Sequence, residues 1–270
     1  MSRFRKLEGL PSWRLISLHA WRPPRDPSVY GTLELDLLET LPWLEERRAA
    51  TGLHLTLTHL IAKAIAMAIG ERPEVNAIVR RRRHLYVRET IDVFFQVAFG
   101  GGEDLSGAKV RQADQKSVET IARELQERVD RIRARQGDDD GRDQVQRLPS
   151  LLRRPALDLA AWLSYDLGLD LRRFGLPYDQ FGSVMITNVG MFGLPVGLAP
   201  LVPFSRTPLL LTVGAVEKRP VAVGEDPEAV EVHPMLTIGA TFDHRVLDGY
   251  QAGKLAQRFS AIVEDPAAHL

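Results

Sequence analysis

Residues 240–249 read Ala240-Thr-Phe-Asp-His-Arg-Val-Leu-Asp-Gly249, and they join a strand to a helix. The strand is predicted to end at Asp243-His244, and a helix over 250–264 follows Gly249. His244 therefore lies at a strand end between two carboxylates, and its imidazole titrates near neutrality, which suits it to removing a proton. A purely structural interpretation is open too, in which Asp248 is the N-cap of the helix and His244 is an ordinary, partly buried residue.

The rest of the chain mixes strands and helices without strict alternation. Strands are predicted over 30–36, 77–79, 91–99, 183–188, 209–216, 230–232 and 235–242. Helices are predicted over 37–50 with an interruption near Pro42, over 56–70, and over 118–132 with Ser117 as the N-cap. The acidic stretch 137–147 indicates an exposed loop, and the leucine-rich stretch 148–171 indicates one helix, or two broken at Pro155. This pattern predicts an α/β chain of the α+β type, with a mixed β-sheet covered by helices.

Residues 244–249 resemble the His-x-x-x-Asp-Gly signature of the acyltransferase components of 2-oxoacid dehydrogenase complexes, which chloramphenicol acetyltransferase shares. Four further segments resemble the same family in the same order: Pro73-Glu-Val-Asn-Ala77 after the helix over 56–70, Lys116-Ser-Val-Glu-Thr-Ile-Ala-Arg-Glu124, Phe181-Gly-Ser-Val-Met-Ile-Thr-Asn-Val-Gly-Met-Phe-Gly193, and Phe259-Ser-Ala-Ile-Val-Glu-Asp-Pro266. The five segments span most of the chain. The resemblance implies the two-layer chloramphenicol acetyltransferase-like fold.

The resemblance also implies a role for each matched residue. His244 would be the general base that takes the proton from the thiol of coenzyme A or of dihydrolipoamide. Thr187 holds the place of the family's hydroxyl donor to the oxyanion, although a β-branched residue is also favoured in a strand on general grounds. Asp248 would hold the histidine loop through an ion pair, for which Arg14 is our candidate partner. The family further implies a homotrimer, or a larger cage, with His244 of one chain facing Thr187 of its neighbour.

The chain also departs from the family pattern. Members usually carry lipoyl-bearing and subunit-binding domains before the catalytic domain, whereas here catalytic-like sequence begins almost at Met1. We therefore expect residues 1–270 to be a single catalytic domain, with any lipoyl group on a separate carrier protein and a 2-oxoacid dehydrogenase as a partner. The stretch 137–178 is expected to be an insertion, and residues 99–107 replace a proline-containing strand of the family.

Composition narrows the function classes. The 270 residues include 35 Lys and Arg and 35 Asp and Glu, so no basic excess points to nucleic acid. The absence of cysteine excludes thiolate catalysis and cysteine-based metal sites, and His54 and His59 lack a third ligand, so we expect no metal. No apolar run is long enough to predict a membrane span, and no secretory signal is present, so we expect a cytoplasmic protein.

The resemblance implies a coenzyme A-dependent acyltransferase that uses a dihydrolipoamide-like thiol as acceptor. Two alternatives remain open: a non-catalytic oligomeric core of a multi-enzyme assembly, and a stand-alone acyltransferase with a small hydroxyl acceptor. The residues that contact coenzyme A are not identified. Arg80-Arg-Arg-Arg83 could bind its phosphates, but a solvated turn between strands is the more favoured interpretation.

Overall fold

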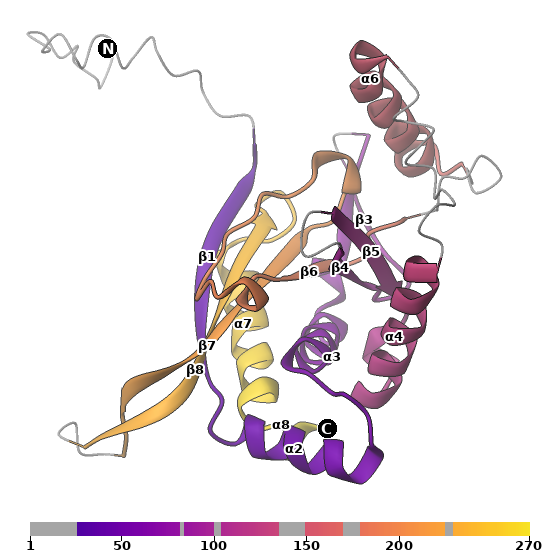
Figure 1. Ribbon diagram of the computed structural model, residues 1–270. Helices are drawn as coiled ribbons and strands as arrows, with labels where there is room; N and C mark the ends of the chain where they lie inside the picture. The colour runs from indigo at the N-terminus through magenta and orange to yellow at the C-terminus, as the bar shows by residue number, and fades with distance from the viewer. Residues whose placement is uncertain (1–25, 82–83, 100–103, 135–148, 170–178, 225–228) are drawn as a thin grey trace, which may run out of the picture.

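The computed structural model describes residues 26–81, 84–99, 104–134, 149–169, 179–224 and 229–270 (Figure 1). Its strands are β1 (Ser28–Asp36), β2 (Ala77–Arg80), β3 (His84–Val87), β4 (Val93–Phe99), β5 (Asp104–Val110), β6 (Val184–Asn188), β7 (Leu209–Ala222) and β8 (Val230–Asp243). Its α-helices are α2 (Thr40–Thr51), α3 (Leu57–Gly70), α4 (Val118–Ala134), α6 (Ser150–Ala161), α7 (Gly249–Glu264) and α8 (Pro266–His269). Among the described residues, no helix is long and apolar enough to span a membrane.

Six strands form one mixed sheet in the order β1-β8-β7-β6-β4-β5, and β2 and β3 form a separate hairpin. The central strands β4, β6 and β7 run parallel, while β1, β8 and β5 are antiparallel to their neighbours. The predicted mixed sheet is confirmed, and helices cover one of its faces (Figure 1). β7 and β8 continue beyond β6 as a two-stranded hairpin.

The main core lies between the covered face of the sheet and α3, α7 and α4. Alternate strand residues such as Val184, Ile186 and Ile238 point into it, and α3 buries most of its apolar side chains there. Each fully buried aliphatic side chain contributes roughly 1.5–3 kcal/mol relative to exposure. A small second cluster of Phe94, Met185 and Leu210 lies on the opposite face. The two clusters therefore report which way each strand residue points.

The helices agree with the predicted positions, with one difference at Pro42. Ser117 accepts a hydrogen bond from the Thr120 N–H at 3.2 Å, as expected of the N-cap of α4. The expected interruption near Pro42 was wrong, because Pro42 is the third residue of α2 and first-turn N–H groups have no intrahelical partner. Of the two alternatives left open at Pro155, the single helix is observed, since α6 runs through Pro155 and continues as a π-helical turn over Trp162–Asp166.

The strands differ from the predicted pattern in two ways. β8 is one continuous strand through Pro234, whose carbonyl accepts the Leu37 N–H at 2.9 Å, where two strands were predicted. β3 and β5 were not predicted. β3 is exposed throughout, so it carries no apolar alternation. β5 occupies part of the segment expected to replace a family strand, and Gly107 makes room there for the ring of Phe94.

The stretch expected to be an insertion contributes a helix that stands apart from the sheet, α6 (Figure 1). Its C-terminal end is attached to the body through Asp166, whose carboxylate lies 3.2 Å from the Arg206 guanidinium. The Arg80 guanidinium donates to the Asp166 carbonyl at 3.2 Å and lies over the Tyr86 ring. Arg80 thus contacts the turn that follows α6 and is more than a solvated turn residue. The expected loop over 137–147 lies outside the described residues.

Candidate active site

The loop that carries His244 is fixed by its backbone. The His244 N–H donates to the Pro27 carbonyl at 2.9 Å, which ties the end of β8 to the chain just before β1. The Val246 and Leu247 N–H groups both donate to the Asp243 carbonyl, at 2.9 and 3.0 Å, and both side chains are buried. The His244 ring therefore projects from a short loop with two buried anchors.

The imidazole of His244 is exposed and has no hydrogen-bond partner among the described residues. It stacks on Phe242, with ring centroids 6.4 Å apart and an interplanar angle of 27°. The neighbouring acid, Asp243, forms an ion pair with Arg245, whose guanidinium nitrogens lie 2.9 and 2.6 Å from the Asp243 carboxylate oxygens. An exposed imidazole with unoccupied ring nitrogens can accept a proton from a bound substrate.

Asp248 is the N-cap of α7. Its Oδ1 accepts the N–H groups of Tyr250 and Gln251 at 2.9 and 3.0 Å, and the Gln251 side chain accepts the Asp248 N–H at 2.8 Å. This is the capping interpretation that the sequence left open. Asp248 forms no ion pair with any described residue, and Arg14 lies outside the described residues, so that pairing stays a prediction.

Thr187 lies in the middle of the sheet, near the C-terminal end of β6. It is half-buried and stands in register between Gln96 of β4 and Thr212 of β7. Its hydroxyl forms no hydrogen bond with the described part of the chain, which leaves it available to a substrate. The next residue, Asn188, is fixed, since its amide donates to the Thr58 hydroxyl at 3.1 Å and its Oδ1 accepts the Met191 N–H at 3.2 Å.

Thr187 and His244 are not brought together within one chain. Thr187 is in register with Thr212, which is in register with Gly239, and Gly239 precedes His244 by five residues. At ~3.4 Å per residue this is about 17 Å along the strand, with two strand spacings of ~4.8 Å across it.

The two side chains also belong to opposite faces of the sheet. Thr187 shares its face with Met185, which packs in the small cluster on the face away from the helices. Phe242, on which His244 stacks, packs against the main core on the helix side. One chain therefore cannot direct both groups at the same substrate atom.

The loop between β6 and β7 covers part of the face on which Thr187 lies. The Thr212 hydroxyl donates to the Gly197 carbonyl, and the same carbonyl lies where a Cβ at Gly239 would stand. The Pro195 carbonyl likewise takes the space that a Cβ at Gly214 would need. These contacts require glycine at both sheet positions, and sequence reasoning did not find them because no local pattern marks them.

No cluster of three or more His, Asp or Glu side chains in the described ranges could hold a metal ion. His59, one of the two histidines considered above, forms a capping box instead, and its Nδ1 accepts the Thr56 N–H at 3.1 Å. Burial, and secondarily the nearby His54, lowers the pKa of His59 to about 4. His59 is therefore neutral at pH 7.

Comparison with known proteins identifies the family. The family model of the 2-oxoacid dehydrogenases acyltransferase (catalytic domain) matches residues 25–140 and 179–270. The chain belongs to this family. The match includes the loop of His244 and the strand of Thr187, and it passes over residues 141–178, within the stretch expected to be an insertion.

Curated members of the acyltransferase family are distantly similar in sequence. The dihydrolipoyllysine-residue acetyltransferase component of the pyruvate dehydrogenase complex of Zymomonas mobilis is 26% identical over 243 residues, which are 89% of this chain and 45% of that protein. The mouse succinyltransferase component of the 2-oxoglutarate dehydrogenase complex is 27% identical over 218 residues, 80% of this chain and 38% of that protein. The chain thus spans less than half the length of these relatives.

Solved structures show the same fold. The cubic core of the pyruvate dehydrogenase multienzyme complex matches with a TM-score of 0.67 and 20% identity, over 99% of this chain and 95% of that one. A probable dihydrolipoamide acetyltransferase from Listeria monocytogenes matches with a TM-score of 0.65 and 21% identity, over 98% of this chain and 96% of that one. At these identities the likeness establishes the fold that the sequence implied.

Proposed function

We propose that this acyltransferase moves an acyl group between coenzyme A and a dihydrolipoamide-like thiol, with His244 as the general base and Thr187 as the oxyanion donor. The observation that carries the proposal is the imidazole of His244, which is exposed on a well-anchored loop and has no hydrogen-bond partner in the described part of the chain, in a member of this family. The curated relatives are named for acyl transfer to a dihydrolipoyllysine residue.

In the proposed reaction His244 takes the proton of the acceptor thiol. The thiolate attacks the carbonyl carbon of the acyl thioester, a new carbon–sulfur bond forms, and the carbonyl oxygen becomes negatively charged. When the tetrahedral intermediate collapses, the original carbon–sulfur bond breaks, and the leaving thiolate takes the proton back from His244. The net reaction exchanges one thioester for another, so it consumes no oxidant and releases no free proton.

The Thr187 hydroxyl would donate to the oxygen that becomes negative. Such donors act on the transition state, and removing one typically costs about 10²–10³-fold in kcat. Because the two residues of one chain lie far apart on opposite faces of the sheet, the proposal requires His244 of one subunit and Thr187 of a neighbour. This requirement calls for at least two chains per site, which the homotrimer implied by the resemblance would supply.

A related crystal structure supports the choice of residues. Crystallographic and enzymatic work on the Azotobacter vinelandii dihydrolipoamide acetyltransferase investigated the role of a serine, a histidine and an asparagine in its catalytic mechanism. The histidine and asparagine of that enzyme are four positions apart, as His244 and Asp248 are here. The partners that we propose are a lipoyl carrier protein and the dehydrogenase of a 2-oxoacid complex, with trimers as the building unit of a possible larger cage.

The test is acyl transfer from acetyl- or succinyl-coenzyme A to free dihydrolipoamide, followed through release of coenzyme A. His244→Ala should lower the rate by about 10²–10⁴-fold, the typical contribution of a general base. His84→Ala is the matched control, since His84 is exposed on β3, outside the site. Equal rates for the two variants would refute the role of His244. Transfer to hydroxyl acceptors but not to dihydrolipoamide would refute the thiol acceptor.

A further inference from the structure

The face of the sheet turned away from the helices carries a row of register partners that includes Thr187. From β5 to β8, strand pairing places side by side Gly107, Gln96, Thr187, Thr212 and Gly239. Phe95 and Val97 of β4 pack in the main core. Because side chains alternate along a strand, Gln96 between them lies on the same face as Thr187. The two residues stand on neighbouring strands, about 4.8 Å apart.

The side-chain amide of Gln96 is free, like the Thr187 hydroxyl. Gln96 is partly buried, and its amide forms no hydrogen bond with the described part of the chain. The next hydroxyl along the row, that of Thr212, donates to the Gly197 carbonyl, so the loop between β6 and β7 covers the row beyond Thr187. Two free polar side chains therefore lie next to each other, on one face and on one chain.

Apolar groups border Gln96 toward β5 and toward the start of β4. Its register partner on β5 is Gly107, and the Phe94 ring fills the space that a Cβ of Gly107 would need. One step back along the strands, Phe94, Met185 and Leu210 form the small apolar cluster of this face. A partly buried amide without a partner costs free energy, which a hydrogen bond to a bound substrate would offset. The neighbouring strand β6 is the side on which such a contact can form.

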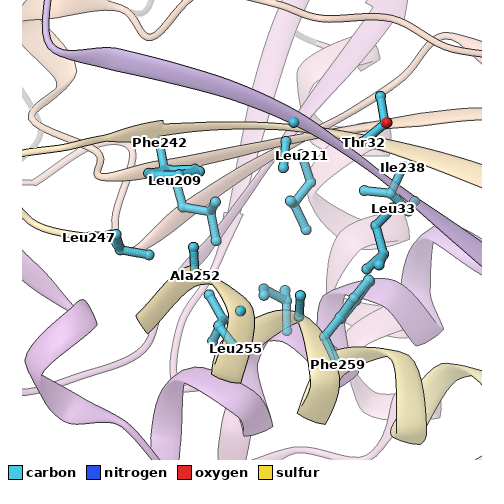
Figure 2. Close-up of a pocket in the computed structure, with 15 residues that line it drawn as sticks. Thr32, Leu33, Leu209, Leu211, Ile238, Phe242, Leu247, Ala252, Leu255 and Phe259 are labelled. Carbon is cyan, nitrogen blue, oxygen red and sulfur yellow. The ribbon is translucent and has the colours of Figure 1, made fainter. Parts of the chain in front are cut away.

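An apolar cavity of about 240 Å³ lies on the other face of the sheet. Figure 2 shows it between the strands and α7, where Leu209, Leu211 and Ile238 line it. These three residues belong to the main core, on the face opposite to Thr187. A substrate carbonyl at Thr187 would therefore have Gln96 beside it, with the cavity on the far side of the sheet.

We propose that Gln96 is a second oxyanion donor, whose side-chain N–H donates to the same thioester carbonyl oxygen as the Thr187 hydroxyl. Glutamine amides are among the donors that stabilise such oxyanions, at about 2.7–3.1 Å. The amide nitrogen stands further from the backbone than a threonine hydroxyl, so the two groups can converge on an oxygen above the strands. This role rests on the proposed acyl transfer, and it places both donors on one chain and His244 on its neighbour.

Two substitutions separate hydrogen-bond donation from the other roles of an amide. Gln96→Leu removes the donor and should lower kcat by about 10²-fold with KM little changed, because the oxyanion forms only on the way to the transition state. Gln96→Glu keeps the shape but brings negative charge to the oxygen, so it should lower kcat at least as far. The loss should be the same with acetyl- and succinyl-coenzyme A, which share the reacting carbonyl.

Gln126→Leu is the matched control. The Gln126 amide donates to Asp130 at 2.8 Å on the exposed side of α4, away from Thr187, so this variant should keep the wild-type rate. Gln96→Met covers the case in which Gln96→Leu does not fold, since methionine is unbranched and of similar length to glutamine. It should show the same loss as Gln96→Leu.

Mixed subunits test which chain supplies Gln96. Gln96→Leu chains mixed with His244→Ala chains should recover about a quarter of the wild-type activity, as expected of two groups on different chains. Gln96→Leu chains mixed with Thr187→Val chains should recover none, because no chain in that mixture carries both donors. Recovery in the second mixture would overturn the proposal, since the two groups would then act at different sites.

The kinetics can overturn the proposal in three further ways. The first is a kcat for Gln96→Leu that stays within a few-fold of the Gln126→Leu value. The second is a change confined to KM or to succinyl-coenzyme A, which would mean that Gln96 binds the ground state or the acyl tail. The third is retained activity in Gln96→Glu, which would mean that the residue accepts a hydrogen bond from substrate.

The proposed acyl transfer is measured first, with the wild type and His244→Ala. A wild type that is inactive with both acyl-coenzyme A substrates would overturn the acyl transfer and the role of Gln96 together. An enzyme that depends on His244 and not on Gln96 would overturn only the role of Gln96.

Discussion

Mixing inactive His244→Ala chains with inactive Thr187→Val chains should restore about a quarter of the wild-type activity, if each site takes its histidine and its threonine from different subunits. After random exchange at equal amounts, half of the chains carry an intact His244 and half an intact Thr187. A given site therefore receives both intact groups with a probability of about one half times one half. A site built within one chain would regain nothing.

The single variants set the background for this measurement. Loss of the hydroxyl donor should lower the rate by about 10²–10³-fold, or roughly 3–4 kcal/mol. Loss of the base should lower it by about 10²–10⁴-fold. The restored quarter therefore exceeds the residual activity of either parent at least about 25-fold. The separation of about 17 Å along β8 is too large for a side-chain rearrangement to remove.

The assay is coenzyme A release after subunit exchange, with exchange verified by native mass spectrometry of differently tagged chains. A second mixture gives an independent reading: wild type with the double variant His244→Ala/Thr187→Val at equal amounts. A two-chain site predicts about a quarter of the wild-type activity and a one-chain site about half. No recovery in the first mixture together with half activity in the second would refute the two-chain reasoning.

Three further outcomes are expected. Burial lowers the pKa of His59 to about 4, so between pH 6.5 and 4 the unfolded chain binds a proton there and the folded chain does not. The free energy of unfolding should therefore fall by up to about 3 kcal/mol as the pH drops through that window. His59→Gln keeps the capping box and should remove this pH dependence from a urea-unfolding series, and an unchanged pH dependence would contradict the assignment. Asp248→Ala should cost about 1 kcal/mol of stability through loss of the N-cap. Asp248→Asn keeps the cap and should cost only a few tenths of a kcal/mol unless an ion pair is lost too, so thermal unfolding of the two variants separates the capping role from the ion-pair role. Gly239→Ala should destabilise the protein by about 1–3 kcal/mol, because the added Cβ meets the Gly197 carbonyl. Gly253→Ala, where the added Cβ meets nothing, should leave the melting temperature unchanged. Equal melting temperatures for the two variants would show that the loop between β6 and β7 can move away from Gly239.

Local patterns in the sequence were enough to predict the elements with strong periodicity. α3, α4 and α7 were predicted because their apolar residues recur on one face, and β6 and the first part of β7 because their runs are short and apolar. The loop of His244 was predicted because a strand, a histidine, an acid and a glycine follow one another within ten residues. These are local signals, and each depends on neighbours in the chain.

The errors came where a distant partner decides the outcome. β3 has no buried face, so its pairing with β2 determines it rather than its own residues. Separate strands were predicted over 230–232 and 235–242, but β8 runs through Pro234. Pro234 stays in register with Lys218 of β7, and its carbonyl accepts the Leu37 N–H at 2.9 Å. Local propensity cannot anticipate either arrangement, since both depend on long-range register.

By itself the sequence determined the family, the mixed sheet and the three residues to test: His244, Asp248 and Thr187. Only the tertiary structure decided how those residues are related. The register across β6, β7 and β8 separates Thr187 from His244 and turns them to opposite faces, and the start of α7 gives Asp248 a capping role. The physical reason is that the sequence gives the type of each side chain at its own position. The distance and direction from one side chain to another depend on strand register and layer packing, and contacts between residues far apart in the chain determine both.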